Sequence, residues 1–155
     1  MSGQIDARLA QLAIELPSPP APVAAYVPYV QTENLIFISG QVSFLGDDQS
    51  TTGKIGADLT PEMGQEAARN AALNTIAHLK NACGGDLDRV TRCVSLRIYV
   101  ASTPDFTGQP AVANGASEVI GEIFGDLGKH SRAAVGVTAL PLNCAVEVES
   151  VWEIA

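Results

Sequence analysis

Alternating apolar and polar positions indicate the strands of this chain. In residues 90–100 one alternate set is apolar apart from its arginine: Val90, Arg92, Val94, Leu96, Ile98 and Val100. Because successive side chains of a strand point to opposite faces, this pattern predicts a strand with one buried face. Residues 26–44 predict a hairpin that turns at Thr32-Glu33-Asn34. Within it, Ser39-Gly40 is typical of a bulge, or of another group lying close to the backbone.

The last 25 residues predict two further strands. The first begins near Arg132, and Leu140-Pro141 ends it because proline cannot donate a ladder hydrogen bond. The second runs from about residue 145 to 154 and alternates apolar residues with glutamates. If the two strands pair as a hairpin, Arg132 and Glu147 approach each other near its open end. Such a pair is either a small-molecule site or a solvated cross-strand pair contributing well under about 1 kcal/mol.

Helical spacing occurs in three segments. Residues 5–16 predict a short amphipathic helix, and the proline-rich residues 17–22 then form an extended linker. Thr60-Pro61-Glu62 is a strong helix start, and this helix ends near Ala82, before Gly84-Gly85. On it we expect His78 to be a surface or hydrogen-bonded histidine. A further helix covers residues 110–124. The predicted fold is an α+β sandwich, a sheet with two helices on one face, with residues 1–22 preceding a domain at 23–155.

Composition restricts the possible functions. The chain has 155 residues, of which 46% are hydrophobic and 17% charged, so one compact domain with a sizeable core is expected. The net charge of -8 argues against nucleic-acid binding, because a phosphate backbone would be repelled. No apolar run approaches the roughly 18 residues of a membrane span. The first residues, MSGQIDARLA, lack a basic leader with an apolar core, so we expect a cytoplasmic protein.

The three cysteines predict neither a disulfide framework nor a metal site. Cys83, Cys93 and Cys144 are odd in number and widely spaced, which is typical of free, buried thiols. The two histidines, His78 and His130, show no metal-ligand spacing with them. We therefore expect no metal cofactor.

Several short motifs occur in an order that resembles a known family. They are Pro28-Tyr29-Val30-Gln31, Phe37-Ile38-Ser39-Gly40-Gln41, and Arg132 followed by Leu140-Pro141 and Glu147. Each is short, but their ordered combination from residue 28 to the C-terminus resembles the RidA/YjgF family of reactive-intermediate imine deaminases, also labelled endoribonuclease L-PSP. Two segments resemble the longer branch of that family: Asn114-Gly115-Ala116-Ser117 and Gly128-Lys129-His130-Ser131-Arg132.

The resemblance implies a chorismate-mutase-like fold and a homotrimer whose sheets face the trimer axis, with ligand clefts between subunits and no cofactor. Apolar residues on both faces of the strands also indicate more burial than one subunit offers. By resemblance, Arg132 binds the carboxylate of a 2-imino or 2-oxo acid and Glu147 orients or activates water. The residues implied to line the cleft are Tyr29, Ser39, Gly40, Asn114 and Ala134, and Lys129 and His130 either add positive charge or lie in an exposed loop.

Three departures from the family pattern bear on activity. Ala134 stands where the family frequently has a cysteine. Alanine suffices at this position if only the backbone N–H contacts substrate. Residues 107–113 are longer than in compact members, and residues 1–22 are additional. On the family motifs, the leading hypothesis is cofactor-independent hydrolysis of enamine or imine intermediates to 2-oxo acids and ammonia. A non-catalytic binding protein for a small carboxylate is the second, and an endoribonuclease the third.

Overall fold

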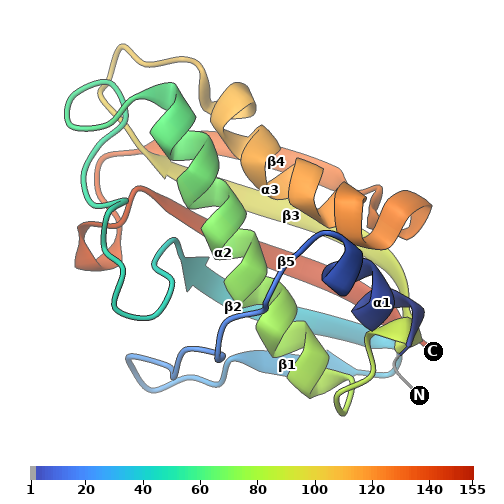
Figure 1. The fold of residues 1–155 in the computed structure, drawn as a ribbon. Helices are drawn as coiled ribbons and strands as arrows, with labels where there is room; N and C mark the ends of the chain where they lie inside the picture. The colour runs from blue at the N-terminus through green and yellow to red at the C-terminus, as the bar shows by residue number, and fades with distance from the viewer. Residues whose placement is uncertain (1–2) are drawn as a thin grey trace.

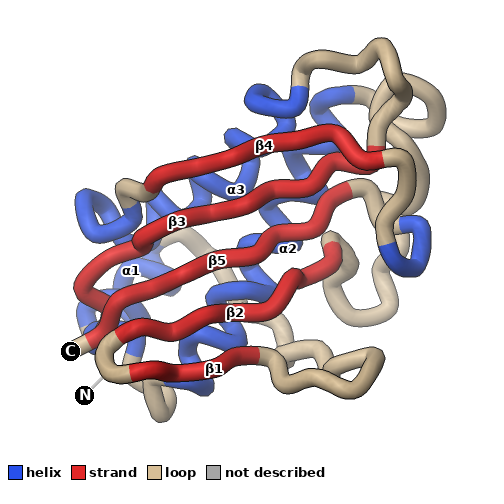
Figure 2. The backbone as a smooth tube through the Cα atoms, turned by 180° about the vertical axis from the view of Figure 1, so that it is seen from behind, coloured by secondary structure: helices blue, strands red, loops and turns tan. Residues whose placement is uncertain are grey.

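The computed structural model describes residues 3–155 and consists of a five-stranded sheet with three α-helices on one side (Figures 1 and 2). The strand order is β1-β2-β5-β3-β4; β3 and β4 run parallel and the other neighbours antiparallel, so the sheet is mixed. The strands are β1 (Tyr29–Thr32), β2 (Leu35–Val42), β3 (Val90–Ala101), β4 (Ser131–Val137) and β5 (Val146–Ile154). The predicted α+β class is confirmed.

The helices are α1 (Gln4–Gln11), α2 (Pro61–Ala82) and α3 (Gln109–Phe124). As predicted, Thr60 caps α2, because its Oγ1 accepts a hydrogen bond from the Met63 N–H at 3.2 Å. Gly84 and Gly85 follow the helix with φ of 68° and 94°, in the region that favours glycine. Within residues 3–155 no helix has both the length and the apolar character needed to cross a membrane.

Helices α2 and α3 pack closely on each other and on the sheet. The buried stripe of α2 is rich in alanine, including Ala68 and Ala72, which have no exposed surface. On α3, a β-carbon at Gly115 would collide with the main-chain carbonyl of Gln65. Small residues on both helices therefore let their backbones approach, and this contact fixes the position of α3 over β3 and β4 (Figure 1).

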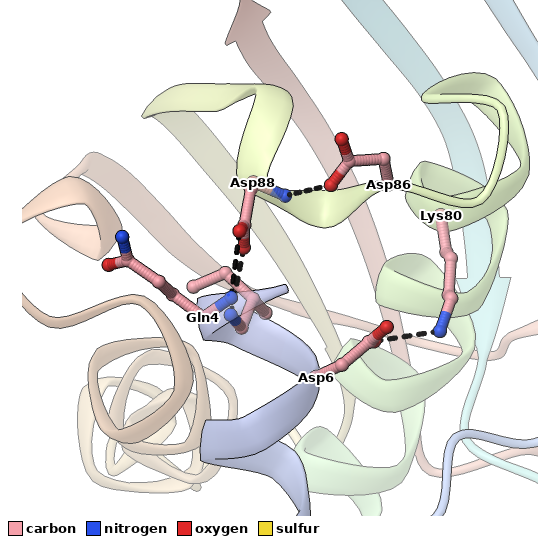
Figure 3. A network of polar contacts seen from close by, with 6 residues as sticks. Gln4, Asp6, Lys80, Asp86 and Asp88 are labelled. Atoms are coloured by element: carbon pink, nitrogen blue, oxygen red, sulfur yellow. Dashed lines mark hydrogen bonds and ion pairs between the residues drawn. The ribbon is translucent and has the colours of Figure 1, made fainter. Parts of the chain in front are cut away.

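The N-terminal helix α1 lies on the same side of the sheet, beside α3, so three helices cover this face rather than two (Figure 1). Its N-terminus is capped from a distant part of the chain, as Figure 3 shows: the Asp88 carboxylate accepts the N–H groups of Gln4 and Ile5 at 2.7 and 2.8 Å. An ion pair of 2.8 Å joins Asp6 to Lys80 of α2. These two contacts from different elements, with the burial of Leu9, hold α1 in place.

The predicted hairpin of β1 and β2 and the bulge at Ser39-Gly40 are both confirmed. The β2–β5 register shifts between Ile38 and Gln41. Pairing of β1 with β2 ends at Ile38, and beyond it the Ser39 N–H and Oγ–H donate to the carbonyls of Pro28 and Val27 at 2.9 and 2.8 Å. The segment before β1 therefore runs along the outer edge of β2, where β1 no longer covers it.

The predicted pairing of the two C-terminal strands is wrong. β4 pairs only with β3, and β5 lies between β2 and β3, so β4 and β5 are not neighbours (Figure 2). The physical reason is the connection between β3 and β4. It contains α3, and a crossover helix brings the next strand back parallel to the first. The other edge of β3 is then left for β5, which pairs with it antiparallel.

The predicted alternation in β3 is interrupted. Cys93 is buried with no exposed surface, whereas Arg92 is exposed, which reverses the expected faces at these positions. Register shifts against β5 between Val90 and Arg92, and between Cys93 and Ser95, explain the change. From Leu96 to Val100 the predicted face is the buried one.

Candidate functional site

Arg132 lies near the start of the edge strand β4, and its side chain is directed at α3. Its Nη1 donates to Asn114 Oδ1 at 2.8 Å and to Ser117 Oγ at 3.1 Å. Its Nη2 donates to the main-chain carbonyl of Pro110 at 3.3 Å. The three acceptors follow one face of α3 at i, i+4 and i+7, which is why a single guanidinium reaches all of them.

These bonds leave part of the guanidinium available. Of the five N–H groups of Arg132, both on Nη1 and one on Nη2 have acceptors. The Nε–H and the second Nη2–H have no acceptor among residues 3–155. Two neighbouring donors of this kind bind a carboxylate through both of its oxygens. Arg132 is therefore a positioned, exposed cation with donors for an anionic ligand.

Ser117 connects Arg132 to His130. The His130 Nδ1 lies 2.6 Å from the carbonyl of Gly128, which can only accept, so Nδ1 carries the hydrogen. In the neutral ring Nε2 is then an acceptor, and the Ser117 hydroxyl lies 2.9 Å from it. Ser117 therefore donates to His130 while accepting from Arg132. Ser117 ends the segment Asn114-Gly115-Ala116-Ser117, for which the sequence predicted a resemblance to the longer branch but no role at the site.

The other implied residues on this side are placed as follows. Ala134 lies two residues after Arg132 on the same strand, pairs with Ile98, and is partly buried against the core. Lys129 forms an ion pair with Asp126 at 2.8 Å and its side chain is 81% exposed. Lys129 therefore lies in an exposed loop with its own partner, whereas His130 is part of the hydrogen-bonded chain to Arg132.

Glu147 and Gly40 form a second group of site residues. A β-carbon at Gly40 would collide with the Glu147 carboxyl group, whose Cδ would lie only 2.9 Å away. The glycine in the β2 bulge thus lets the carboxyl lie directly against the backbone of β2. Partial burial, and secondarily the negative charge of Glu149, raise the pKa of Glu147 above its ordinary value. A carboxyl group with a raised pKa is suited to accept and return a proton.

A cleft surrounds this second group. Its lining includes Val23, Tyr26, Ser39, Gly40, Pro141 and Glu147. Glu149 also lines it but has partners of its own, Arg97 at 2.8 Å and the Tyr99 hydroxyl at 3.0 Å. Tyr29, implied as a cleft residue, instead packs partly buried against the core. Tyr26, which the sequence analysis did not name, lines the cleft.

The two groups lie on opposite faces of the sheet within one chain. Arg132 contacts α3 on the helix-covered face, whereas Glu147 lies between the buried Val146 and Val148 and therefore points to the other face. The expectation that these two side chains approach within one hairpin is therefore wrong. Strands β5 and β4 are separated by β3, and the alternation of β5 turns Glu147 away from the helices.

Thiol and metal chemistry find no support in the described residues. Cys83, Cys93 and Cys144 are free and buried, as predicted. Burial raises the pKa of the Cys93 thiol to about 12, so it stays protonated and is a poor nucleophile. Within residues 3–155 no three His, Cys, Asp or Glu side chains gather as metal ligands.

Known proteins resemble this chain along nearly its whole length. A family model described as "YjgF/chorismate_mutase-like, putative endoribonuclease" matches residues 6–154. Protein TCP17 of Trypanosoma cruzi is 45% identical over 154 residues, which cover 99% of this chain and 96% of that protein. A 2-iminobutanoate/2-iminopropanoate deaminase of Dermatophagoides farinae is 26% identical over 139 residues, covering 89% of this chain and 92% of that protein.

Solved structures share the fold. The crystal structure of a protein of unknown function from Agrobacterium tumefaciens superposes with a TM-score of 0.90 at 40% sequence identity, covering 97% of this chain and 92% of that one. The mixed sheet with helices on one face is therefore the YjgF/chorismate-mutase-like fold. With a family match from residue 6 to residue 154, the chain belongs to the YjgF/RidA family.

Proposed function

We propose that this protein hydrolyses reactive enamine and imine intermediates to 2-oxo acids and ammonia, without a cofactor. The observation that carries the proposal is the hydrogen bonding of the Arg132 guanidinium. Three of its N–H groups are bound by α3, and two are left for a carboxylate. In a chain of net charge -8, a positioned cation of this kind selects a small anionic ligand.

The chemistry requires orientation, a water and a proton relay. An enamine first takes a proton on carbon to become the imine. The oxygen of water then bonds to the carbon of the protonated imine, and the Glu147 carboxylate accepts the proton that the water loses. Return of that proton to nitrogen lets the C–N bond break, and transfer of the hydroxyl proton to the departing ammonia leaves ammonium and the 2-oxo acid. No covalent enzyme intermediate is needed, which agrees with buried, protonated thiols.

The separation of the two groups supports a proposed assembly. One chain cannot direct Arg132 and Glu147 at the same molecule, because they lie on opposite faces of its sheet. We infer a homotrimer in which Arg132 of one subunit and Glu147 of the next share a cleft. The uncovered face of the sheet also exposes apolar side chains, with Val30 at 54%, Phe37 at 44% and Val135 at 46%, and burial between subunits would cover them.

The relatives support the same class of reaction. One of them is named as a 2-iminobutanoate/2-iminopropanoate deaminase and matches 89% of this chain at 26% identity. In this reaction Glu147 activates water through its carboxylate, and Arg132 binds the substrate through its guanidinium. Neither step needs a thiol, so Ala134 in place of the family cysteine is compatible with the proposed hydrolysis.

The test is ammonia release from imines generated in place by an amino-acid oxidase, over the rate without protein. We expect Arg132→Ala to lower kcat/KM on the order of 10²–10³-fold, because the substrate carboxylate loses its charged partner. The matched control is Arg92→Ala, an exposed strand arginine on β3, which should retain full activity. Equal activity of wild type and Arg132→Ala would refute the assignment.

A binding protein for a small carboxylate is the second candidate, because the Arg132 donors can hold an anion whether or not Glu147 acts. Saturable binding of a 2-oxo acid without acceleration of any imine would favour it. An endoribonuclease is less compatible with the geometry. His78 is buried on α2 and His130 is held between Ser117 and Gly128, so the two do not form an acid–base pair.

A further inference from the structure

A second cavity adjoins the proposed cleft. It has a volume of about 260 Å³ and lies between α2, the end of β2 and the proline-rich segment before β1. Asn74 and His78 of α2 form one wall, and Val42 and Phe44 another. Several residues of the segment before β1, among them Pro20, Val23 and Tyr26, line it as well, together with the turn at Pro141-Leu142.

This cavity adjoins the cleft around Glu147. Val23, Tyr26, Gly40 and Pro141 line both spaces. Gly40, which lies against the Glu147 carboxyl group, adds no side chain to the boundary between the two spaces. A molecule held beside Glu147 can therefore extend a substituent past Gly40 and Tyr26 into the cavity.

The walls of the cavity are neutral. Its lining contains prolines, Val23, Tyr26 and Phe44, and its polar members are amides, a serine and His78; among the described residues no charged side chain lines it. In a chain with 17 acidic and 9 basic residues, that composition marks a space from which charges are excluded. Neutral ligand groups are favoured there over ionised ones.

His78 is a further sign of a ligand space. We expected a surface or hydrogen-bonded histidine; His78 is not on the surface, since it is 3% exposed, and its Nε2 has no partner among residues 3–155. Burial lowers the pKa of His78, and the Pro20 carbonyl opposes this by accepting a hydrogen bond from the ring. The neutral ring therefore retains one acceptor nitrogen in the wall of an otherwise largely apolar cavity.

We propose that this cavity is the side-chain pocket of the substrate cleft and that it receives neutral side chains of leucine or phenylalanine size. The inference rests on the proposed imine hydrolysis and names its substrate class. A volume of 260 Å³ is below the roughly 300–1,000 Å³ of pockets that hold whole drug-sized ligands, so it suits one substituent. This volume equals that of about nine water molecules at roughly 30 Å³ each. An ethyl group would leave most of the cavity unfilled.

The experiment compares four imines, generated by oxidases from 2-aminobutanoate, leucine, phenylalanine and glutamate, with the full-length protein. We expect kcat/KM for the leucine or phenylalanine imine to exceed that for the 2-aminobutanoate imine about tenfold or more, because more apolar surface is buried. The glutamate imine should gain nothing from its size, because its carboxylate would enter a neutral cavity.

The outcomes separate this inference from the proposed function. Turnover of the 2-aminobutanoate imine that equals or exceeds turnover of the larger neutral imines overturns the pocket and leaves the hydrolase standing. Failure to accelerate any of the four imines overturns both. A preference for the glutamate imine overturns the neutral pocket alone.

A variant tests the cavity itself. Val42→Phe adds volume at a partly buried wall position, whereas Val27→Phe changes a neighbouring valine, 56% exposed, that lines neither space. We expect Val42→Phe to remove the tenfold advantage of the large imines while retaining turnover of the small one. Val27→Phe should leave the ratio unchanged. An unchanged ratio in Val42→Phe, or an equal loss for all imines, contradicts the assignment.

Discussion

The regions around Arg132 and around Glu147 are built in opposite ways. The Arg132 guanidinium is held by three hydrogen bonds to α3, and one of its acceptors, Ser117, is itself bonded to His130. The Glu147 carboxyl is positioned by packing: the missing side chain at Gly40 makes room for it. One region fixes a cation with partners, and the other keeps an acid partly desolvated and raises its pKa.

The difference matches what each region is proposed to do. A carboxylate clamp needs a fixed direction and a permanent charge, and arginine keeps its charge in any environment. A proton relay needs a group whose charge can change, so partial burial of Glu147 helps it and bonds to several donors would not. Because the two regions lie on opposite faces of one sheet, we infer that each is half of a site that a second copy of the chain completes.

The largest effect is expected when each half of the proposed site is removed in a separate variant. Arg132→Ala and Glu147→Gln should each lose about 10²-fold or more in kcat/KM. Co-expression of the two variants in equal amounts should restore activity, because a cleft between subunits can draw its arginine from one variant and its glutamate from the other. With random assembly about one quarter of the clefts regain both groups.

The control is each variant co-expressed with a second tagged copy of itself, which should stay inactive. Light scattering on the same samples measures the assembly. Mixed assemblies without recovered activity would place both halves of the site in one chain, and a monomer at micromolar concentration would remove the shared cleft altogether.

The next prediction concerns Gly40. Gly40→Ala places a β-carbon against the Glu147 carboxyl group, so we expect a loss of about 1–3 kcal/mol in the free energy of unfolding and a fall of at least about tenfold in kcat. Gly121→Ala is the control, since nothing lies near its β-carbon and α3 is helical there, so stability should rise slightly. Urea unfolding and imine turnover measure both. If Gly40→Ala behaves like Gly121→Ala, Glu147 does not depend on the bulge.

Local structure was largely predictable from the sequence because it depends on nearby residues. The Thr60-Pro61 start of α2, the turn between β1 and β2 and the bulge at Gly40 each follow from short-range rules and are confirmed. The pairing of β4 was not predictable from its own pattern. It depends on α3 crossing the sheet between β3 and β4, and on which edge of β3 that leaves for β5.

The site was only partly predictable for the same reason. Family motifs pointed to Arg132 and Glu147, but a residue's face on a sheet depends on register, and bulges change it, as at Cys93 in β3. No role was predicted for Ser117 or Tyr26 from the sequence, and the folded contacts bring them to the site. Which of the two expected environments His78 has was not predictable either, because the proline-rich segment that covers it lies far away in the sequence.

A smaller effect is expected at Ser117, which positions Arg132 without touching substrate in our proposal. Ser117→Ala removes one acceptor from the guanidinium, so we expect KM for the imine to rise up to about tenfold while kcat changes little. Ser117→Thr keeps a hydroxyl and should restore most of the affinity. Steady-state kinetics on all three proteins would measure this. A fall in kcat with unchanged KM would instead indicate that Ser117 takes part in the chemistry.

The smallest predicted effect is a displacement in pH and concerns Glu149. The negative charge of Glu149 helps raise the pKa of Glu147, so Glu149→Gln should lower that pKa. In this variant Arg97 also loses its carboxylate partner, and its positive charge lowers the pKa of Glu147 further. Glu147 would then stay ionised to lower pH, and the acidic limb of the kcat/KM profile should move down in pH while activity near pH 7 stays the same.

Glu153→Gln, on the same face of β5 but bonded to Asn34 and Thr91, is the control and should leave the limb in place. An upward shift in Glu149→Gln, or equal shifts in both variants, would mean that the limb reports a group other than Glu147. Burial, the larger cause of the raised pKa, remains in Glu149→Gln, so the limb should still lie above the pH expected for an ordinary glutamate.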